Sequence, residues 1–348
     1  FDPATLKLFS SPFDVLPGDV TSVFPDSLIE IPVYVHGEED HQFDRDDYLL
    51  FYGFAASHFI LDPELTWYDN GYARNSVYWL TFGGAPGRRM VEDDATWNGD
   101  DPDTTVTEIV HVEQDIGNPT RSGVNWYWLD VSPLTGSLGS GSIALHHPYA
   151  RGEADITLSL FTLSGATFLY EFSIDGEVFF SETLYLPTRS TWPPHYLTGT
   201  TSLSSDSSVL RMDIIRPAGV TTSLTAFFNS ADLRYTRLTD LSSPFHAYMD
   251  TAQTYVLQCT NVNDDPYILD ITDGRAPRRL VNYTYDNNTI RLTGSADSIQ
   301  VLYFTTDALT QPARLVAANP GSVRKPSPGY EYLFITHPKF LTAIQPLV

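Results

Sequence analysis

Short runs of β-forming residues recur along almost the whole chain, and glycine, proline, serine and aspartate separate them. Between about residues 140 and 238 they follow one another closely: Ser142–His146, Ala154–Thr162, Thr167–Ile174, Glu177–Phe180, Ser208–Ile215 and Thr222–Leu238. No segment there has the apolar spacing of an amphipathic helix. Many short strands with turn residues between them predict a β-sandwich or jelly roll.

Similar strand patterns flank this segment on both sides. The expected strands are Leu28–Val35, Asp47–Gly53, Asn75–Gly83 and Thr105–Glu113 before it, and Thr254–Thr260, Pro266–Asp273, Ala276–Leu280, Thr289–Leu292 and Ile299–Phe304 after it. Pro32 has no backbone N–H to donate to a neighbouring strand, so its strand is expected at a sheet edge.

The chain is expected to hold several domains. Its 348 residues exceed the length over which a single core usually grows, about 250–300 residues. The polar stretch Asp93–Asp103 predicts a linker and a boundary near residue 104. We predict an all-β chain with an N-terminal β domain (1–104), a β-sandwich or jelly-roll-like domain (105–245) and a small β domain (246–327).

Residues 328–348 have a different pattern. Tyr332–Thr336 is an apolar run typical of a strand buried on both faces, as in a parallel sheet. Thr336 can cap a helix that tolerates Pro338 in its first turn, and Phe340, Leu341, Ile344 and Leu347 follow at helical spacing. This pattern predicts a linker followed by the first strand and helix of an α/β domain. Because one strand and one helix cannot close a core, we expect the chain to be the front part of a longer polypeptide.

Several sequence words are similar to one peptidase family. Glu331–Phe340 resembles the start of the caspase-like catalytic domain of gingipain-type cysteine peptidases, and most closely the members related to the type IX secretion sortase. Asp47–Gly53 and Asn75–Thr81 resemble two segments of the N-terminal region of that family. The segment from His111 to Trp128 and the word Leu269–Asp273 also resemble the family. The matches are scattered over most of the chain.

The resemblance implies a function for the longer protein. A caspase-like domain would hydrolyse or transpeptidate peptide bonds with a histidine–cysteine pair lying downstream of residue 348. No residue of this chain matches either catalytic position, so we predict no catalytic, cofactor-binding or metal-binding residue within it. The resemblance also implies an outer-membrane-associated or secreted bacterial protein, whose partners are its own catalytic domain and secretion-system or cell-envelope proteins.

Composition excludes some classes of partner. The formal net charge is −23, and residues 1–120 hold 23 acidic and 5 basic side chains, a net charge of −18. Such a surface repels nucleic-acid phosphates and anionic lipids. No apolar run approaches the roughly 18 residues of a membrane helix. With lysine only at three positions, both a salt-loving source and an ordinary acidic extracytoplasmic surface stay open. No signal-peptide pattern precedes Phe1, so we expect a mature or trimmed chain.

Cys259 is the single cysteine and the one thiol that could act as a nucleophile. A nucleophilic thiolate needs a nearby histidine and an accessible setting. Cys259 shares a predicted strand face with Tyr255 and Leu257, so we expect a buried core cysteine. The order of residues in Gly139–Ser142 does not match a nucleophile elbow, and we expect a loop there.

Two groups of side chains suggest metal binding. Asp44, Asp46 and Asp47 alternate in an expected turn, as calcium ligands do, but they lack the glycine and glutamate spacing of an EF-hand. We favour a solvated turn in which aspartates bond their own backbone, and the sequence leaves calcium binding undecided. His111 and Glu113 lie on one face of a predicted strand, but two ligands are too few for a site.

A different class of protein stays open as an alternative. A β-sandwich without an attached enzyme can bind carbohydrate or protein, and Trp126, Tyr127, Trp128 and Trp192 could form a stacking platform for a sugar. The core is the more common place for aromatic residues of this kind. The reading frame after Val348 separates the two classes.

Overall fold

The structure, a computed structural model, describes residues 1–12, 27–61, 64–71, 73–121, 126–133, 137–190, 193–263, 265–306, 309–312, 314–317 and 339. In these residues all regular structure is β-strand, apart from two short 3-10 helices, η1 (Pro3–Thr5) and η2 (Glu38–Asp40), and the 3-10 residue Lys339. The all-β prediction is therefore confirmed for this part of the chain. The strand and helix predicted at 328–348 lie outside the described residues, apart from Lys339. The contacts divide the chain into two units, Phe1–Leu309 and Thr310–Val348, and the fold below is that of the first.

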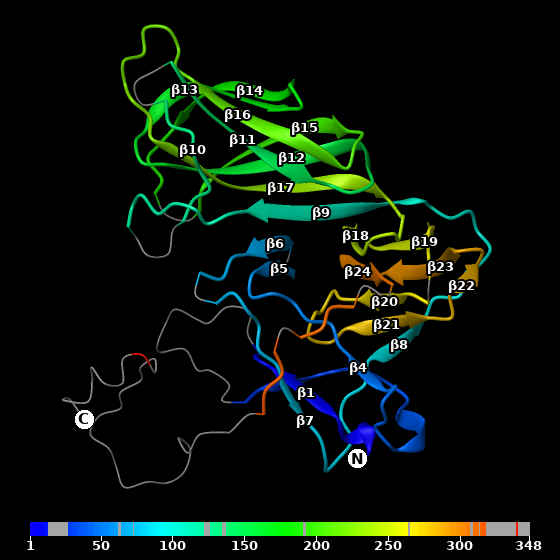
Figure 1. Ribbon diagram of the computed structural model, residues 1–348. Coiled ribbons are helices and arrows are strands. Elements are labelled where there is room, and N and C mark those ends of the chain that lie inside the picture. The colour runs from blue at the N-terminus through cyan, green and yellow to red at the C-terminus, as the bar shows by residue number, and fades with distance from the viewer. Residues whose placement is uncertain are drawn as a thin grey trace, which may run out of the picture. The chain divides into compact units, whose positions relative to one another are not determined.

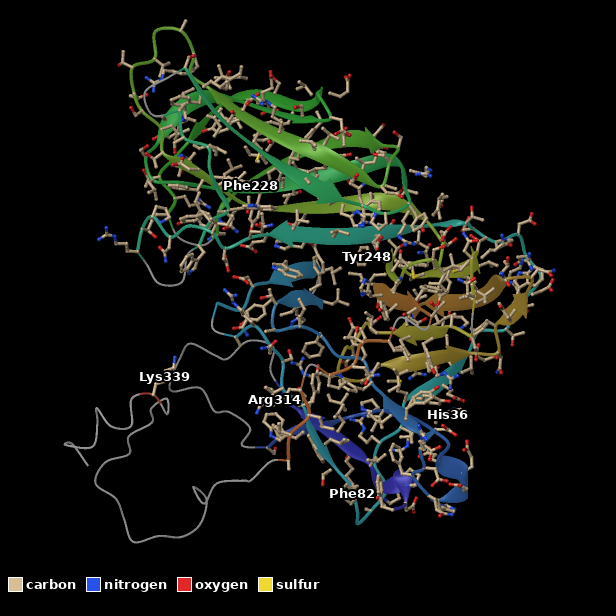
Figure 2. The ribbon with its side chains drawn as sticks, in the orientation of Figure 1. His36, Phe82, Phe228, Tyr248, Arg314 and Lys339 are labelled. Atoms are coloured by element: carbon tan, nitrogen blue, oxygen red, sulfur yellow. The ribbon has the colours of Figure 1, made fainter. Side chains whose placement is uncertain are left out.

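The predicted β-sandwich is present as two facing sheets (Figure 1). A four-stranded sheet has the order β11 (Leu138–His146), β16 (Ser207–Ile215), β13 (Ala166–Ile174) and β14 (Glu177–Leu186). It packs against part of a ten-stranded sheet formed by β15 (His195–Leu203), β12 (Ala150–Thr162), β17 (Ala226–Leu238) and β9 (Thr105–Glu113), with β10 (Leu129–Asp130) beside β17. Buried and exposed residues alternate along β13 and β16, because successive side chains of a strand point to opposite faces. Phe228 lies inside this sandwich (Figure 2).

The predicted loop at Gly139–Ser142 is wrong, since these residues lie in β11. Glycine is required at positions 139 and 141 because a side chain there would clash with the preceding segment. A Cβ on Gly139 would come within 2.3 Å of the Val131 carbonyl oxygen, and one on Gly141 would press on Leu129 and Val131 at 3.1 Å. The segment preceding β11 therefore crosses the strand closely where a side chain would otherwise stand.

Strand β15 was not predicted from the sequence. Its residues are mostly threonine, glycine and serine, and its burial pattern places only Leu197 and Leu203 fully in the core. It is an edge strand of the large sheet. A Cβ on Gly199 would lie 2.7 Å from the Phe179 ring and 2.9 Å from its carbonyl oxygen, so glycine lets β14 approach β15 at this seam.

Residues 245–305 form a smaller sandwich beside the first (Figure 1). One layer is the three-stranded sheet β19 (Gln253–Cys259), β23 (Thr289–Ala296) and β22 (Thr284–Asp286). The other continues the ten-stranded sheet through β18 (Phe245–Met249), β24 (Gln300–Thr305), β20 (Tyr267–Asp270), β21 (Arg278–Val281) and β8 (Val91–Asp94). A second apolar core, which includes Phe304 and Leu292, lies between these layers.

The ten-stranded sheet runs without interruption across residues 105 and 245. Asp93 and Asp94, expected in a linker, instead end β8, which pairs in parallel with β21. The link between the two sandwiches is narrow, because β9 and β18 share one register pair, Thr107 with Tyr248 (Figure 2). The boundaries near residues 104 and 245 stay predictions.

The N-terminal region has smaller sheets. The strands β2 (Ile29–Ile31), β1 (Lys7–Ser10) and β7 (Trp79–Thr81) form one sheet, and β3 (Tyr34–His36) with β4 (Tyr48–Leu50) and β5 (His58–Leu61) with β6 (Leu65–Tyr68) form two hairpins. Pro32 ends β2, which is an edge strand as predicted. The core of this region contains Leu6, Leu8, Ile31, Val33 and Val35.

Candidate functional site

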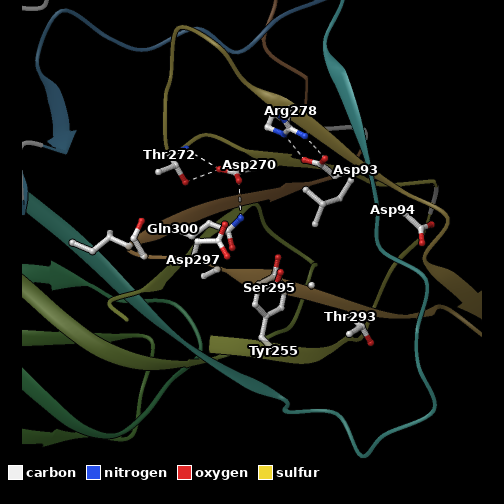
Figure 3. A pocket seen from close by; sticks show the side chains of 15 residues that line it. Asp93, Asp94, Tyr255, Asp270, Thr272, Arg278, Thr293, Ser295, Asp297 and Gln300 are labelled. Atoms are coloured by element: carbon white, nitrogen blue, oxygen red, sulfur yellow. Dashed lines mark hydrogen bonds and ion pairs between the residues drawn. The ribbon is translucent and has the colours of Figure 1, made fainter. Parts of the chain in front are cut away.

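A recess of about 550 Å³ lies where the two layers of the smaller sandwich meet (Figure 3). Strands β8, β20, β21 and β24 of the large sheet contribute to it, and β19 and β23 of the small sheet complete it. Its lining contains four aspartates, Asp93, Asp94, Asp270 and Asp297, and one arginine, Arg278, which gives a formal charge of −3. Hydroxyl and amide groups make up most of the remaining polar lining, from Tyr255, Thr272, Thr293, Ser295, Ser298 and Gln300.

Neighbouring donors hold three of the aspartates in place: Asp270 and Asp93, and also Asp94. Asp270 Oδ1 accepts hydrogen bonds from the Thr272 N–H at 2.9 Å and its hydroxyl at 2.6 Å, and Asp270 Oδ2 accepts one from Gln300 Nε2 at 2.6 Å. Asp93 forms a bidentate ion pair with Arg278 across the β8–β21 pair (Figure 3). These contacts favour the ionised form of the Asp270 and Asp93 carboxylates and fix the positions of their oxygens.

Asp94 and Asp297 complete the carboxylates. Hydrogen bonds from the Asn282 amide, at 2.8 Å, and from the Thr96 hydroxyl, at 2.9 Å, lower the pKa of Asp94. Asp297 is exposed in the turn between β23 and β24, and its carboxylate forms no hydrogen bond or ion pair with the described residues. Asp297 lines the recess, so its oxygens are available there as acceptors.

Tyr255 lies beneath the recess because its partner residue across the strands is a glycine. Tyr255 pairs with Gly294, and a Cβ on that glycine would lie 2.2 Å from the Tyr255 hydroxyl oxygen. The tyrosine is 7% exposed, and its hydroxyl forms no hydrogen bond within the described part of the chain. Burial, with the charges of Asp270 and Asp93, raises the pKa of Tyr255, so the phenol stays protonated. Gln300 Oε1 is a buried polar atom without a partner in the described residues.

A buried ion pair stands at the junction of the two sandwiches. Arg237 is completely buried, and its Nε lies 3.0 Å from Oε2 of Glu108. The same oxygen accepts the Tyr235 hydroxyl at 2.7 Å, and Glu108 Oε1 accepts the His246 N–H of β18 at 3.2 Å. Burial raises the pKa of Glu108, and the contacts with Tyr235 and Arg237 partly offset that rise. The pair therefore supplies side-chain bonds where the backbone ladder between β9 and β18 is short.

His111 and Glu113 lie together as predicted, and the structure adds a third group. His111 Nε2 lies 3.0 Å from Glu113 Oε2, and Nδ1 lies 2.7 Å from Asp232 Oδ1 on β17. Both ring nitrogens are therefore occupied by carboxylates. The Trp67 ring of β6 stacks on the imidazole at 4.3 Å. Within the described residues no group of three histidine, cysteine or acidic side chains is arranged to hold a metal ion.

The other residues singled out in the sequence lie apart from one another. Cys259 is completely buried in β19, as predicted, and burial raises the pKa of its thiol. Asp44 and Asp46 are exposed and Asp47 is half-buried, and Asp47 Oδ2 accepts the Asp44 N–H at 2.6 Å, which is the predicted aspartate-to-backbone bond in a turn. The alternating carboxylates therefore form a turn at the surface.

The fold separates Trp126, Tyr127 and Trp128, the adjacent aromatic residues considered as a platform for stacking a sugar. Tyr127 is 2% exposed and stacks on Phe227 at 5.1 Å, and Trp128 packs against the sandwich core. Trp126 is 41% exposed, and Trp192 lies outside the described residues. The three described aromatics, Trp126, Tyr127 and Trp128, do not share one exposed face.

The comparisons with known proteins concern the fold. Neither a protein-family model nor a curated protein sequence matches this chain. A solved structure of dimeric latent PorU from Porphyromonas gingivalis matches 87% of this chain with a TM-score of 0.65 and 16% sequence identity. This chain spans 29% of the length of that structure. The similarity shows a shared fold.

Two other solved structures match with low TM-scores. The CBM36-1 domain of a multidomain xylanase from the hindgut metagenome of Trinervitermes trinervoides matches 36% of this chain and 95% of its own, at 17% identity and a TM-score of 0.24. A cycloisomaltooligosaccharide glucanotransferase of a Paenibacillus species matches 62% of this chain and 48% of its own, at 9% identity and a TM-score of 0.22. These scores are too low to support an inference. In the described residues, no helix is both long and apolar enough to cross a bilayer.

Proposed function

We propose that this chain is the non-catalytic N-terminal region of a gingipain-like cysteine peptidase, in the class to which PorU belongs. The longer protein would hydrolyse or transpeptidate peptide bonds through a histidine–cysteine pair downstream of residue 348. The observation that carries the proposal is the fold shared with PorU over 87% of the chain. The sequence words from Asp47 to Phe340, which resemble the same family in the same order, support it independently.

The setting of Cys259 supports a non-catalytic role for this part of the protein. The thiol is completely buried in a strand, and its raised pKa keeps it protonated at neutral pH. A nucleophilic cysteine needs the opposite conditions, an accessible sulfur and a lowered pKa. The catalytic thiol of the proposed peptidase therefore belongs to residues after Val348.

The role proposed for the β-domains is to support, dock or shield the catalytic domain. The ten-stranded sheet joins both sandwiches and β8 into one framework, which supports the first of these roles. A secreted or outer-membrane-associated location, and docking to secretion-system or cell-envelope proteins, are parts of the same proposal. The acidic surface agrees with partners other than nucleic acid.

The experiment begins with the reading frame after Val348. We expect it to encode an α/β domain with a histidine and a cysteine at strand ends. The longer polypeptide is then treated with a thiol-alkylating peptidyl inhibitor, and the labelled residue is located by mass spectrometry. A label on a cysteine after residue 348, with Cys259 unlabelled, agrees with the proposal. A stop codon or a further sandwich after Val348 contradicts it and favours the binding module without an enzyme.

A further inference from the structure

We propose that the recess of the smaller sandwich binds a cationic nitrogen group, the guanidinium or ammonium of an arginine or lysine side chain. The inference is independent of the peptidase proposal. It rests on two kinds of observation. One is the charge of the lining, and the other is the presence of two polar groups, the buried Gln300 amide oxygen and the Tyr255 hydroxyl, that form no hydrogen bond with the described residues.

The charge of the recess favours a cation. Four aspartates and one arginine leave a formal charge of −3, and Arg278 is already paired with Asp93. The bonds to Asp270 and Asp94 come from neutral hydroxyl, amide and backbone donors, so they leave those charges uncompensated. Carboxylates fixed around a concave surface concentrate the negative potential there.

The hydrogen-bonding groups favour a ligand that is rich in donors. Gln300 Oε1 is a buried acceptor with no donor in the described residues, and Asp297 presents further acceptor oxygens. The Tyr255 side chain is 7% exposed and lines the recess (Figure 3), and its hydroxyl forms no hydrogen bond with the described residues. A buried polar group without a partner is costly, so natural structures usually satisfy it. A guanidinium has five N–H donors and no acceptor, which complements these groups.

A bare metal ion fits the recess less well. The carboxylates of Asp93, Asp94 and Asp270 already accept hydrogen bonds from protein donors. Calcium needs six to eight oxygen ligands in its inner shell. No group of three acidic, histidine or cysteine side chains in the described part of the chain has the arrangement of a metal site.

The binding test uses the 1–348 chain and small probes in isothermal titration calorimetry. The cationic probes are acetyl-argininamide and acetyl-lysinamide, and acetyl-citrullinamide is the neutral match in shape. We expect saturable binding of a cationic probe, at least about tenfold tighter than the citrulline analogue, because a charge-assisted hydrogen bond contributes about that much. The peptide Gly-Arg-Gly distinguishes the source. Tighter binding of the peptide than of acetyl-argininamide indicates a polypeptide partner, and equal binding indicates recognition of the free group, and both support the cation.

Two variants locate the binding in the recess. Asp297→Asn removes an exposed charge, and Tyr255→Phe removes the hydroxyl while the ring still covers Gly294, so both variants should fold. Each is expected to weaken the cationic probe about tenfold or more. Asp101→Asn removes an exposed aspartate outside the recess and should leave binding unchanged. The proposal is overturned if no cationic probe binds, if citrulline binds equally well, if Asp101→Asn weakens binding as much as Asp297→Asn, or if calcium binds and the cationic probes do not.

Discussion

The large β-sandwich and the N-terminal region bury their apolar residues to very different degrees. Among the described residues the sandwich core contains 25 buried side chains, and the N-terminal core contains five. Trp79 and Leu80 of β7 are 43% and 45% exposed, and Phe82, which follows this strand, is 62% exposed. The sandwich closes its own core, while the N-terminal region keeps much of its apolar surface outside a core.

The N-terminal region therefore depends on its contacts with the large sheet. Strand β8 pairs with β21, and Trp67 of β6 stacks on His111 of β9. The hydroxyls of Tyr48 and Tyr267 also form a hydrogen bond between the N-terminal region and the smaller sandwich. Small cores provide little stability on their own, so these attachments should decide how well this region is ordered.

The sharpest test of this comparison removes one phenylalanine from each region. Phe172 is completely buried in the sandwich, and Phe172→Ala should lower the free energy of unfolding by about 3–5 kcal/mol. Phe82→Ala, next to β7 of the N-terminal sheet, should change it by less than about 1 kcal/mol, because Phe82 is already 62% exposed. Urea unfolding curves measure both. Equal losses from the two variants would show that the N-terminal sheet has a closed core.

The junction between the sandwiches should be nearly as sensitive. Arg237→Met keeps most of the side-chain volume but leaves the Glu108 carboxylate buried without its cation, which should cost about 3 kcal/mol. Arg211→Met is the matched control, because the Arg211–Asp213 pair lies at the surface and contributes about 1 kcal/mol or less. Thermal or urea unfolding compares the two. If Arg237→Met lowers the free energy of unfolding no more than Arg211→Met does, the buried Arg237–Glu108 pair does not stabilise this junction.

The attachment of the β5–β6 hairpin should depend on pH. Burial lowers the pKa of His111, but the hydrogen bonds and charges of Asp232 and Glu113 outweigh burial and raise the pKa overall. A histidine whose pKa is raised on folding adds stability that is complete below its unfolded pKa, about 6.5. That stability is lost as pH rises through the folded pKa.

Hydrogen exchange of the β5–β6 amides, corrected for the intrinsic effect of pH, measures this attachment. We expect protection to fall at alkaline pH in the wild-type chain and to be lower and independent of pH in His111→Gln. The sandwich strands β13 and β16 serve as the internal control, since His111 does not contact them. Protection that rises with pH would contradict the protonated state of His111.

The smallest expected effect comes from salt. Residues 1–120 carry a net charge of −18, which repels itself more strongly when screening is weak. The screening length falls from about 30 Å at 0.01 M salt to about 3 Å at 1 M. Melting temperature should rise with potassium chloride, with a larger gain of amide protection in the N-terminal region than in the sandwich. A flat or falling melting temperature over this range would count against the repulsion and against a salt-loving source.

The sequence predicted the strands of both sandwiches that are rich in β-forming residues. It missed strands whose glycines are needed because neighbouring segments pack closely against them. Strand β9 was predicted with its observed bounds, because most of its residues are β-branched types that favour strands. The strands β11 and β15 were misjudged because their glycines, such as Gly139 and Gly199, are required by neighbouring chain segments that a local pattern does not reveal.

The recess could not be predicted because distant segments build it. Asp93 comes from β8 and Arg278 from β21, and only their parallel pairing brings the two together. Tyr255 faces the recess because Gly294 lies opposite it on another strand. The contact of His111 with Glu113 followed from residues two apart on one strand face, but Asp232 is separated from them by over a hundred residues. Local periodicity predicts faces of strands and cannot predict which faces meet.

The most direct test of the account is the dependence of peptide hydrolysis on Cys259. The 1–348 chain and the polypeptide extended past Val348 are each prepared as wild type and as Cys259→Ala, and all four are assayed on a mixture of short fluorogenic peptides. The account predicts no hydrolysis by either form of the 1–348 chain, and equal hydrolysis by both forms of the extended polypeptide. Hydrolysis by the 1–348 chain that disappears in Cys259→Ala would contradict it.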